Sequence, residues 1–221
     1  MRDVLLIEAC LTTVSSLYIG AGADREAGGS RDLPVLRNAL DDMPIVPGSS
    51  LRGRMVTLLK AHCADAIAGE ETAAQALAIL FGTPGKRSAL SFWDCQPEVP
   101  WAYEHRAAGL ALTHWRSEQA PMPDKRLVFR RRELISAGVR FRFRLTLLAA
   151  QAENAGLPTQ VALDRVRQGL LLMEQHGIGG ATRRASSYLS PLSRSNRLNV
   201  SSAHSRCDHR VAFRVEGNGP D

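Results

Sequence analysis

Residues 139–147 read VRFRFRLTL, and apolar and polar side chains alternate through the whole stretch. Successive side chains of a β-strand point to opposite faces of its sheet, so this pattern predicts a strand with two unlike faces. The core face holds Val139, Phe141, Phe143, Leu145 and Leu147, and the cationic face holds Arg140, Arg142 and Arg144. This stretch is the fixed point from which the rest of the fold can be interpreted.

Apolar residues recur at helical spacing in two other stretches, 49–62 and 161–176. Ser49 and Ser50 suit the start of the first helix, and Gly177 suits the end of the second. A shorter helical piece is expected at 75–81. Apolar runs at 4–14, 89–95 and 211–215 predict three further strands.

The predicted elements follow the order strand, helix, strand, strand, helix, strand, which is that of a ferredoxin-like or RRM-like α+β domain. The chain has 221 residues and is 44% hydrophobic, enough for one good core, and we expect a single domain over residues 1–221. Segments 20–48 and 96–130 lack a sustained period. We expect them to be inserted, as a long loop and a thumb-like insertion, and residues 190–221 to form an irregular tail.

The charge balance favours a nucleic acid partner. The formal net charge is +6, and the basic residues comprise 25 arginines and three lysines. Guanidinium binds phosphate through two parallel hydrogen bonds and also stacks on bases. A GC-rich genome is the alternative explanation for so much arginine. The arginines cluster, at 126–132, 140–144 and 183–184, which suits an electrostatic footprint on nucleic acid.

Several classes of protein are disfavoured. No apolar run approaches the length that crosses a bilayer, and Asp3 and Glu8 interrupt the apolar start, so we expect a cytoplasmic protein without a membrane partner. The four cysteines form no CxxC pair and indicate neither a disulfide framework nor a structural zinc site.

The segment PIVPGSSLRGR, residues 44–54, is the strongest candidate for ligand binding. Its prolines and Gly48 predict an extended approach and a sharp turn into a helix. The free amides of a helix start attract phosphate. Arg52 and Arg54 follow in the first turn, where they oppose the helix dipole unless an anion is bound. The alternative is an ordinary capped helix with solvated arginines.

Four motifs in this order resemble the RAMP superfamily: PIVPGSSLRGRM at 44–55, LFGTPGKRSALSFWD at 80–94, RRRELISAGVRFRF at 130–143 and GIGGATRR at 177–184. More narrowly they resemble the backbone subunit of type III CRISPR interference complexes, the Csm type first and the Cmr type second. The resemblance covers about residues 1–190. It implies an RRM-like core, several copies polymerised along a CRISPR RNA, and a target RNA paired to that guide.

The resemblance also implies an RNA-binding role for particular residues. Sequence would be read by base pairing, so the protein needs charge and shape rather than a base code. Other copies of the chain, other type III subunits, the CRISPR RNA and a single-stranded target RNA are the expected partners in antiviral defence. The expected RNA-binding residues are Ser49, Ser50, Arg52, Arg54, Arg31, Arg37, Arg140, Arg142, Gly179, Gly180, Arg183 and Arg184.

The segment GGSRDLPVLR, residues 28–37, resembles the family segment whose aspartate is required for metal-dependent cutting of target RNA. The matching residue is Asp32. An aspartate beside RNA can position a hydrated Mg²⁺ or Mn²⁺, with the RNA supplying the other ligands, and so assist attack by the adjacent 2′-hydroxyl. Arg31 and Arg37 could stabilise the developing charge or hold the loop on phosphate. The alternative for Asp32 is a turn-capping aspartate.

Two other functions stay open. The chain could be a scaffold that holds the guide without cutting, or a repeat-processing ribonuclease of the same superfamily that uses a histidine base. His105 and His114 are the candidates for that base. Trp101, Tyr103 and Trp115 could stack on RNA or pack the insertion against a neighbouring copy.

Overall fold

The computed structural model of the chain describes residues 4–20, 32–64, 70–99, 101–121, 127–178, 197–202 and 211–214. Within these ranges a main sheet has the strand order β3-β7-β1-β8-β9, with β4 pairing on β7. All of its pairings are antiparallel. The bounds are β1 Val4–Thr12, β3 Leu90–Phe92, β4 Gln96–Pro97, β7 Arg140–Leu148, β8 Arg197–Ser202 and β9 Val211–Arg214.

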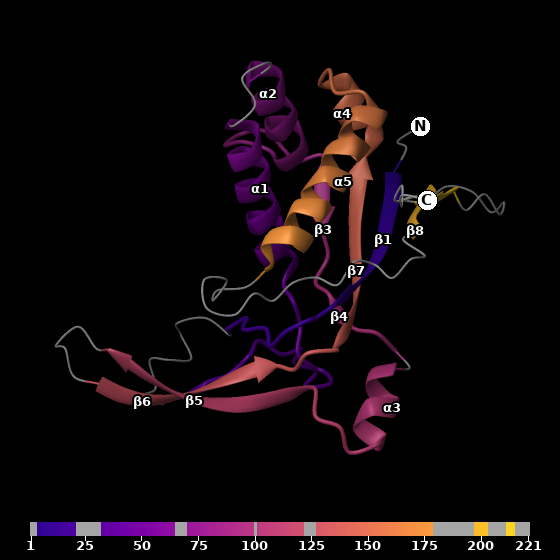
Figure 1. The fold of residues 1–221 in the computed structure, drawn as a ribbon. Helices are drawn as coiled ribbons and strands as arrows, with labels where there is room; N and C mark the ends of the chain where they lie inside the picture. Colours follow the sequence, from indigo (N-terminus) through magenta and orange to yellow (C-terminus); the bar gives the residue numbers. More distant parts are fainter. Residues whose placement is uncertain are drawn as a thin grey trace, which may run out of the picture.

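Helices cover one side of the main sheet (Figure 1). They are α1 Gly48–Ala64, α2 Glu70–Phe81, α4 Ala149–Asn154 and α5 Thr159–His176. Helix α1 connects β1 to β3, and α5 connects β7 to β8. With the strand order β3-β7-β1-β8 this is the ferredoxin-like topology, so the predicted α+β class is confirmed. None of the helices in the described ranges is both long and apolar enough to cross a membrane.

The alternation in β7 is confirmed. Phe141, Phe143, Leu145 and Leu147 are all within 1% of complete burial, while Arg140 and Arg142 are exposed. The apolar face packs on α1 and α5, whose own contact is close because α5 carries a glycine there. A Cβ on Gly169 would lie 2.6 Å from Cγ of Met55. The buried face of β7 is therefore the predicted one.

A second, three-stranded sheet lies beside the main one, in the order β2-β6-β5. Strands β5 (Thr113–Pro121) and β6 (Leu127–Ile135) form an antiparallel hairpin that projects from the main domain (Figure 1). Strand β2, Asp32–Leu33, pairs with β6 in parallel. Helix α3, Trp101–Ala107, precedes the hairpin. The long loop therefore docks on the thumb-like insertion.

The structure differs from the sequence-based prediction in several places. Residues 197–202, inside the tail expected to be irregular, form β8, which pairs with the free edge of β1 through its backbone. Residues 96–97 join the main sheet, and β6 continues to residue 135, so the inserted segment is displaced from 96–130. Helices α3 and α4 were not predicted. Each of these segments is too short or too polar to show a period in its side chains, so the sequence pattern does not reveal its secondary structure.

Candidate nucleic-acid interface

Asp32 lies in β2, directly paired with Arg131 in β6. Residues paired in register point to the same face of a sheet, so the two side chains meet. Arg131 donates from Nε to Oδ1 of Asp32 at 2.9 Å and from its terminal nitrogen to Oδ2. The hydrogen bond from Arg131 holds the pKa of the Asp32 carboxyl below its ordinary value. Asp32 is therefore ionised and held in a two-point ion pair.

Buried neighbours fix the position of Asp32. Leu33 is 6% exposed and Val35 is fully buried, and the backbone N–H of Val35 donates to Oε2 of Glu133 at 3.1 Å. Val35 also bridges to Gly20. The loop around Asp32 is thus anchored to both the hairpin and the segment after β1, and it presents the Asp32 side chain at the surface, 31% exposed.

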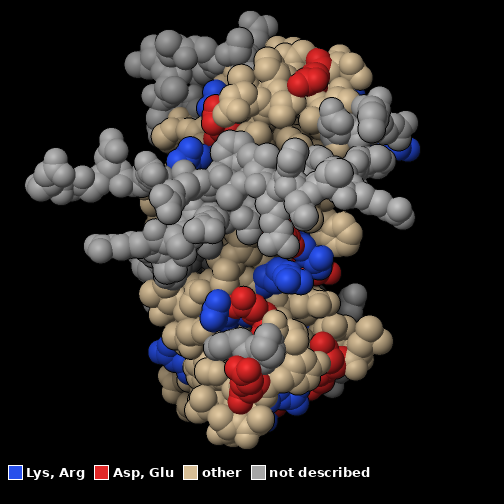
Figure 2. Space-filling model, turned by 90° about the vertical axis from the view of Figure 1, so that its right-hand side faces the viewer, with Lys and Arg blue, Asp and Glu red and all other residues tan. Residues whose placement is uncertain are grey.

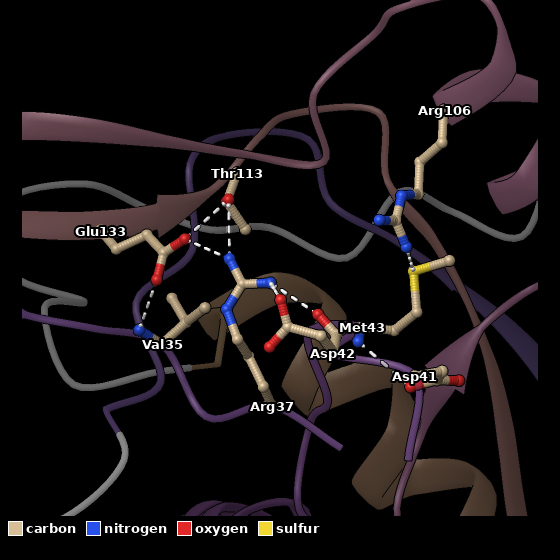
Figure 3. Close-up of polar contacts among 8 residues, drawn as sticks. All are labelled: Val35, Arg37, Asp41, Asp42, Met43, Arg106, Thr113 and Glu133. Atoms are coloured by element: carbon tan, nitrogen blue, oxygen red, sulfur yellow. Dashed lines mark hydrogen bonds and ion pairs between the residues drawn. The ribbon is translucent and has the colours of Figure 1, made fainter. Parts of the chain in front are cut away.

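Glu133 is the centre of this anchor (Figure 3). Its carboxylate accepts hydrogen bonds from the Val35 amide, the Thr113 hydroxyl at 2.7 Å and Arg37. Burial opposes ionisation of Glu133. The hydrogen bonds from Thr113, Val35 and Arg37 outweigh it, so the pKa lies below its ordinary value. This buried, fully hydrogen-bonded carboxylate therefore has a structural role, because it connects the Asp32 loop to the hairpin.

Arg37 is bound by protein groups on both arms of its guanidinium. One terminal nitrogen donates to the backbone oxygen of Asp42 at 2.6 Å, and the other to Glu133 and to Thr113 at 3.2 Å (Figure 3). Its side chain is 26% exposed. This geometry gives Arg37 the task of holding the loop, and its contact with RNA stays a prediction. Arg31 lies outside the described residues.

The start of α1 differs from an open anion site. The backbone N–H of Gly48 donates to Oδ1 of Asp94 at 2.8 Å, so a carboxylate of the chain already occupies one of the amides expected to face phosphate. Gly48 is required there, since a Cβ would lie 2.5 Å from the backbone oxygen of Phe92. Ser49 and Ser50 are exposed beside this contact. Asp94 was not anticipated, although it ends the second of the four motifs.

Arg52 and Arg54 turn away from the start of α1 to the ends of two other helices. Arg52 donates to the backbone oxygen of Phe81, the last residue of α2. Arg54 donates to the oxygens of His176 at 2.7 Å and Gly177 at 2.9 Å, at the end of α5. Cations are favourable at helix C-termini. These contacts explain the position of both arginines without an anion, and their contact with RNA stays a prediction.

Arg54 also fixes the beginning of the glycine-rich turn. Gly177 has a φ of +70°, which favours glycine, and Ile178 is 4% exposed. The other predicted RNA contacts in this turn, Gly179, Gly180, Arg183 and Arg184, lie outside the described residues.

The cationic face of β7 is mixed with acidic groups. Arg140 forms an ion pair with Glu98 at 2.8 Å, and Arg144 lies 5.3 Å from the ring centre of the exposed Trp93. Arg142 is exposed, opposite Cys10. Figure 2 shows basic and acidic side chains adjoining one another across the described surface it displays, rather than one continuous basic area. Arg142 therefore has the most open setting of the three.

The hairpin places an exposed aromatic ring beside Arg131. Trp115 is 46% exposed and pairs across the hairpin with Glu133, and the guanidinium of Arg131 lies 5.3 Å from its ring centre. His114 is on the opposite face of β5, where Nδ1 lies 3.1 Å from Oγ of Ser136. Tyr103, 53% exposed, and His105 belong to α3. The side chain of Trp101 lies outside the description.

Arg131, like Glu133 and Asp94, is a residue of this site that sequence reasoning did not single out. Its signal was the run Arg130-Arg131-Arg132 in the third motif, but the run does not show which arginine faces Asp32. The alternation of β6 makes that choice. Arg132 points to the other face, over the ring of Tyr18 at 4.7 Å.

The described residues around Asp32 do not by themselves form a site for a divalent metal. Nowhere in the described ranges do three His, Cys, Asp or Glu side chains come together as a metal-binding group. Divalent cations of the Mg²⁺ type need several oxygen ligands, and both oxygens of Asp32 are in contact with Arg131. The requirement for Mg²⁺ or Mn²⁺ stays a prediction.

Fold and site together define a ferredoxin-like protein in which an anchored loop presents one carboxylate beside a basic, aromatic hairpin. The family model of the RAMP superfamily matches residues 10–184, and the chain belongs to this superfamily. A solved structure described as "Cryo-EM structure of the Type III-B Cmr-beta bound to cognate target RNA" shares the fold, with a TM-score of 0.59 at 14% identity over 90% of this chain and 61% of the other.

Three curated relatives match over short segments, and each is described as "CRISPR system Cms endoribonuclease Csm3". The protein of Mycobacterium tuberculosis (strain ATCC 25618 / H37Rv) is 45% identical over 24% of this chain and 22% of its own length. The protein of Enterococcus italicus is 36% identical over 28% of this chain and 29% of its own length. The protein of Streptococcus thermophilus is 44% identical over 20% of this chain and 20% of its own length. The matched segments thus span less than a third of the curated relatives.

Proposed function

We propose that the chain is a backbone subunit of a type III CRISPR ribonucleoprotein, Csm-type before Cmr-type, that polymerises with other copies along CRISPR RNA and cleaves the paired target RNA. Membership of the RAMP superfamily, the Csm3 relatives and the Cmr-beta fold neighbour support the assembly. The observation that carries the cleavage is the presentation of Asp32. Buried anchors hold it at the surface, paired with an arginine whose guanidinium lies near an exposed tryptophan.

Guide binding rests on charge and backbone geometry. Ser49 and Ser50 expose their hydroxyls at the start of α1, and Arg140 and Arg142 are exposed on β7. Arg52 and Arg54 shape the surface by holding the ends of α2 and α5 beside this segment. Phosphate contacts position a nucleic acid strand, while pairing between guide and target reads the sequence.

Cleavage is an internal transfer within the target strand. The 2′-oxygen attacks the adjacent phosphorus, and a new bond to that oxygen forms as the bond to the 5′-oxygen of the next nucleotide breaks. The 2′-hydroxyl loses its proton to a base, and the leaving 5′-oxygen gains one. The products are a 2′,3′-cyclic phosphate and a 5′-hydroxyl. Asp32 is the carboxylate available to orient the 2′-hydroxyl and accept its proton.

Dependence on Mg²⁺ or Mn²⁺ is a separate prediction to be measured, and no step above passes through the ion. It is tested by titrating each metal into the assembled, chelator-treated complex with labelled target RNA. Loss of cleavage on chelation and recovery with either metal would support it.

A guide-binding scaffold without cleavage is the second candidate. The observation in its favour is the ion pair of Asp32 with Arg131, which engages both carboxylate oxygens. A repeat-processing ribonuclease has less support, because His114 lies on the face of β5 opposite to Asp32 and His105 belongs to α3.

The test is to express the chain with its operon neighbours, purify the complex and add a target RNA complementary to the copurified guide. Asp32→Asn should abolish target cutting while the guide still copurifies. Asp164→Asn is the matched control, since Asp164 is an exposed carboxylate on α5. Unchanged cutting by Asp32→Asn would exclude the proposed catalytic role, and absence of a copurifying RNA would exclude the whole assignment.

A further inference from the structure

Among the described residues, two ion pairs join the Asp32 loop to β6, and they differ in burial. In the pair between Arg37 and Glu133 the carboxylate is 4% exposed. In the pair between Asp32 and Arg131 the side chains are 31% and 60% exposed. The buried pair holds the loop. The exposed pair is screened by water and contributes little to stability, so another partner can replace either of its members.

The position of β2 does not depend on the exposed pair. Strand β2 is held by backbone pairing to β6, by the buried side chains of Leu33 and Val35, and by the hydrogen bond from the Val35 amide to Glu133. Arg131 can leave Asp32 without releasing the loop.

The guanidinium of Arg131 is shaped and placed for phosphate. Its planar fork donates two parallel hydrogen bonds to the carboxylate of Asp32, and phosphate accepts the same two-point geometry. Trp115 lies against the guanidinium, with the Arg131 Cζ 5.3 Å from the ring centre, and both side chains are accessible. This contact holds the guanidinium over the hairpin when its acceptor changes.

We propose that Arg131 is a catalytic residue, which exchanges the Asp32 carboxylate for the scissile phosphodiester of the target RNA. This rests on the proposed cleavage function. After the exchange, the guanidinium binds the non-bridging phosphate oxygens, where negative charge develops. The Asp32 oxygens that Arg131 had occupied can then contact the neighbouring 2′-hydroxyl. Asp32 and Arg131 thus act on adjacent groups of one nucleotide linkage.

The test compares the assembled complex carrying wild-type chain, Arg131→Ala, Arg131→Lys or Arg116→Ala. Arg116 is the matched control, an exposed arginine on the opposite face of the same hairpin. Each complex receives a target RNA with either a normal linkage or a single phosphorothioate at the cleaved position. The single-turnover rate and the affinity for target are measured separately.

We expect Arg131→Ala to slow cleavage about 100-fold, as for the loss of one donor to a developing oxyanion. Affinity for the target should change less than about tenfold, because pairing to the guide sets it. Sulfur substitution should slow the wild-type and Arg116→Ala complexes and have little further effect on Arg131→Ala. A structural role for Arg131 does not predict this loss of sensitivity to sulfur.

Cleavage by Arg131→Ala at the wild-type rate, faster cleavage, or an undiminished effect of sulfur would each overturn the proposal. If the Arg131→Ala complex does not retain guide RNA, the Arg131→Lys complex is the test of the proposal. The lysine ammonium is a point charge and cannot donate the two parallel hydrogen bonds of a guanidinium, so cleavage by Arg131→Lys should slow at least about tenfold. Full activity of Arg131→Lys would overturn the proposal. A wild-type complex that binds the target without cutting it refutes the underlying cleavage function, which is a different result.

Discussion

Arg37 and Glu133 lie 96 residues apart in the chain and form an ion pair at the junction between the long loop and the hairpin. Glu133 also binds the backbone of Val35, three residues after Asp32. The same carboxylate thus joins the loop to the insertion and sets the position of Asp32. The position of Asp32 is therefore set by contacts within the chain and does not require RNA.

Replacing Glu133 should destabilise the chain. Glu133→Leu removes the acceptor for Arg37 and Val35, and breaking a buried pair of this kind costs about 3 kcal/mol of unfolding free energy. Urea denaturation measures the loss. The double variant Arg37→Leu with Glu133→Leu should recover part of it, with a coupling energy of at least about 1 kcal/mol. Strict additivity of the two single changes would show that the pair is not an energetic unit.

The stability supplied by Glu133 should depend on pH in one direction. Its folded pKa lies below the ordinary 4.5, so this stability is present above that value and is lost as the pH falls through the folded pKa. The difference in unfolding free energy between wild type and Glu133→Gln should therefore be constant near neutrality and shrink below about pH 4.5. Denaturation at several pH values checks this. A difference that widens in acid would contradict it.

Gly53 inside α1 and Gly169 inside α5 should respond oppositely to alanine. At Gly169 a Cβ would lie 2.6 Å from Cγ and 2.8 Å from Sδ of Met55, so Gly169→Ala should cost about 1–3 kcal/mol by overpacking. At Gly53 nothing lies within 4 Å, and Gly53→Ala should stabilise the chain by about 0.5–1 kcal/mol through helix propensity. Melting temperatures compare the two variants, and a stabilising Gly169→Ala would exclude the close packing of α1 on α5.

Substitutions of Arg142 and Arg54 should have different effects, one on the affinity for RNA and the other on the stability of the fold. Arg142 is exposed on β7, so Arg142→Gln should lower the slope of log affinity for guide RNA against log salt by about 0.7. Arg54 binds the end of α5, so Arg54→Gln should lower thermal stability. Filter binding over a range of salt and thermal melting give the two readings. An unchanged slope for Arg142→Gln would remove it from the RNA surface.

Local pattern was enough to predict much of the fold. The alternation at 139–147 located β7 and its buried face, and helical spacing located α1 and α5, because these periods follow from backbone geometry within one element. The pattern did not predict β8, since this short, largely polar strand is held by backbone pairing with β1 and β9, which leaves no period in the side chains.

The candidate site was predicted less completely, because its contacts join residues from different elements and leave no local pattern in the sequence. Motif resemblance pointed to Asp32 and to the serine segment at 49–50. It assigned Arg52, Arg54 and Arg37 to RNA, and the fold engages all three with carbonyl or carboxylate groups of the chain. An arginine in a sequence shows that a charge is available but not which acceptor it meets.

The amino-acid sequence by itself determined the class of fold, the two faces of β7 and the residues able to carry the chemistry, because these follow from residue type and from spacing within one element. Only the tertiary structure decided that Arg131 faces Asp32 and that Glu133 holds the loop. Each of these contacts joins residues nearly a hundred positions apart, and the register between β2 and β6 brings them together.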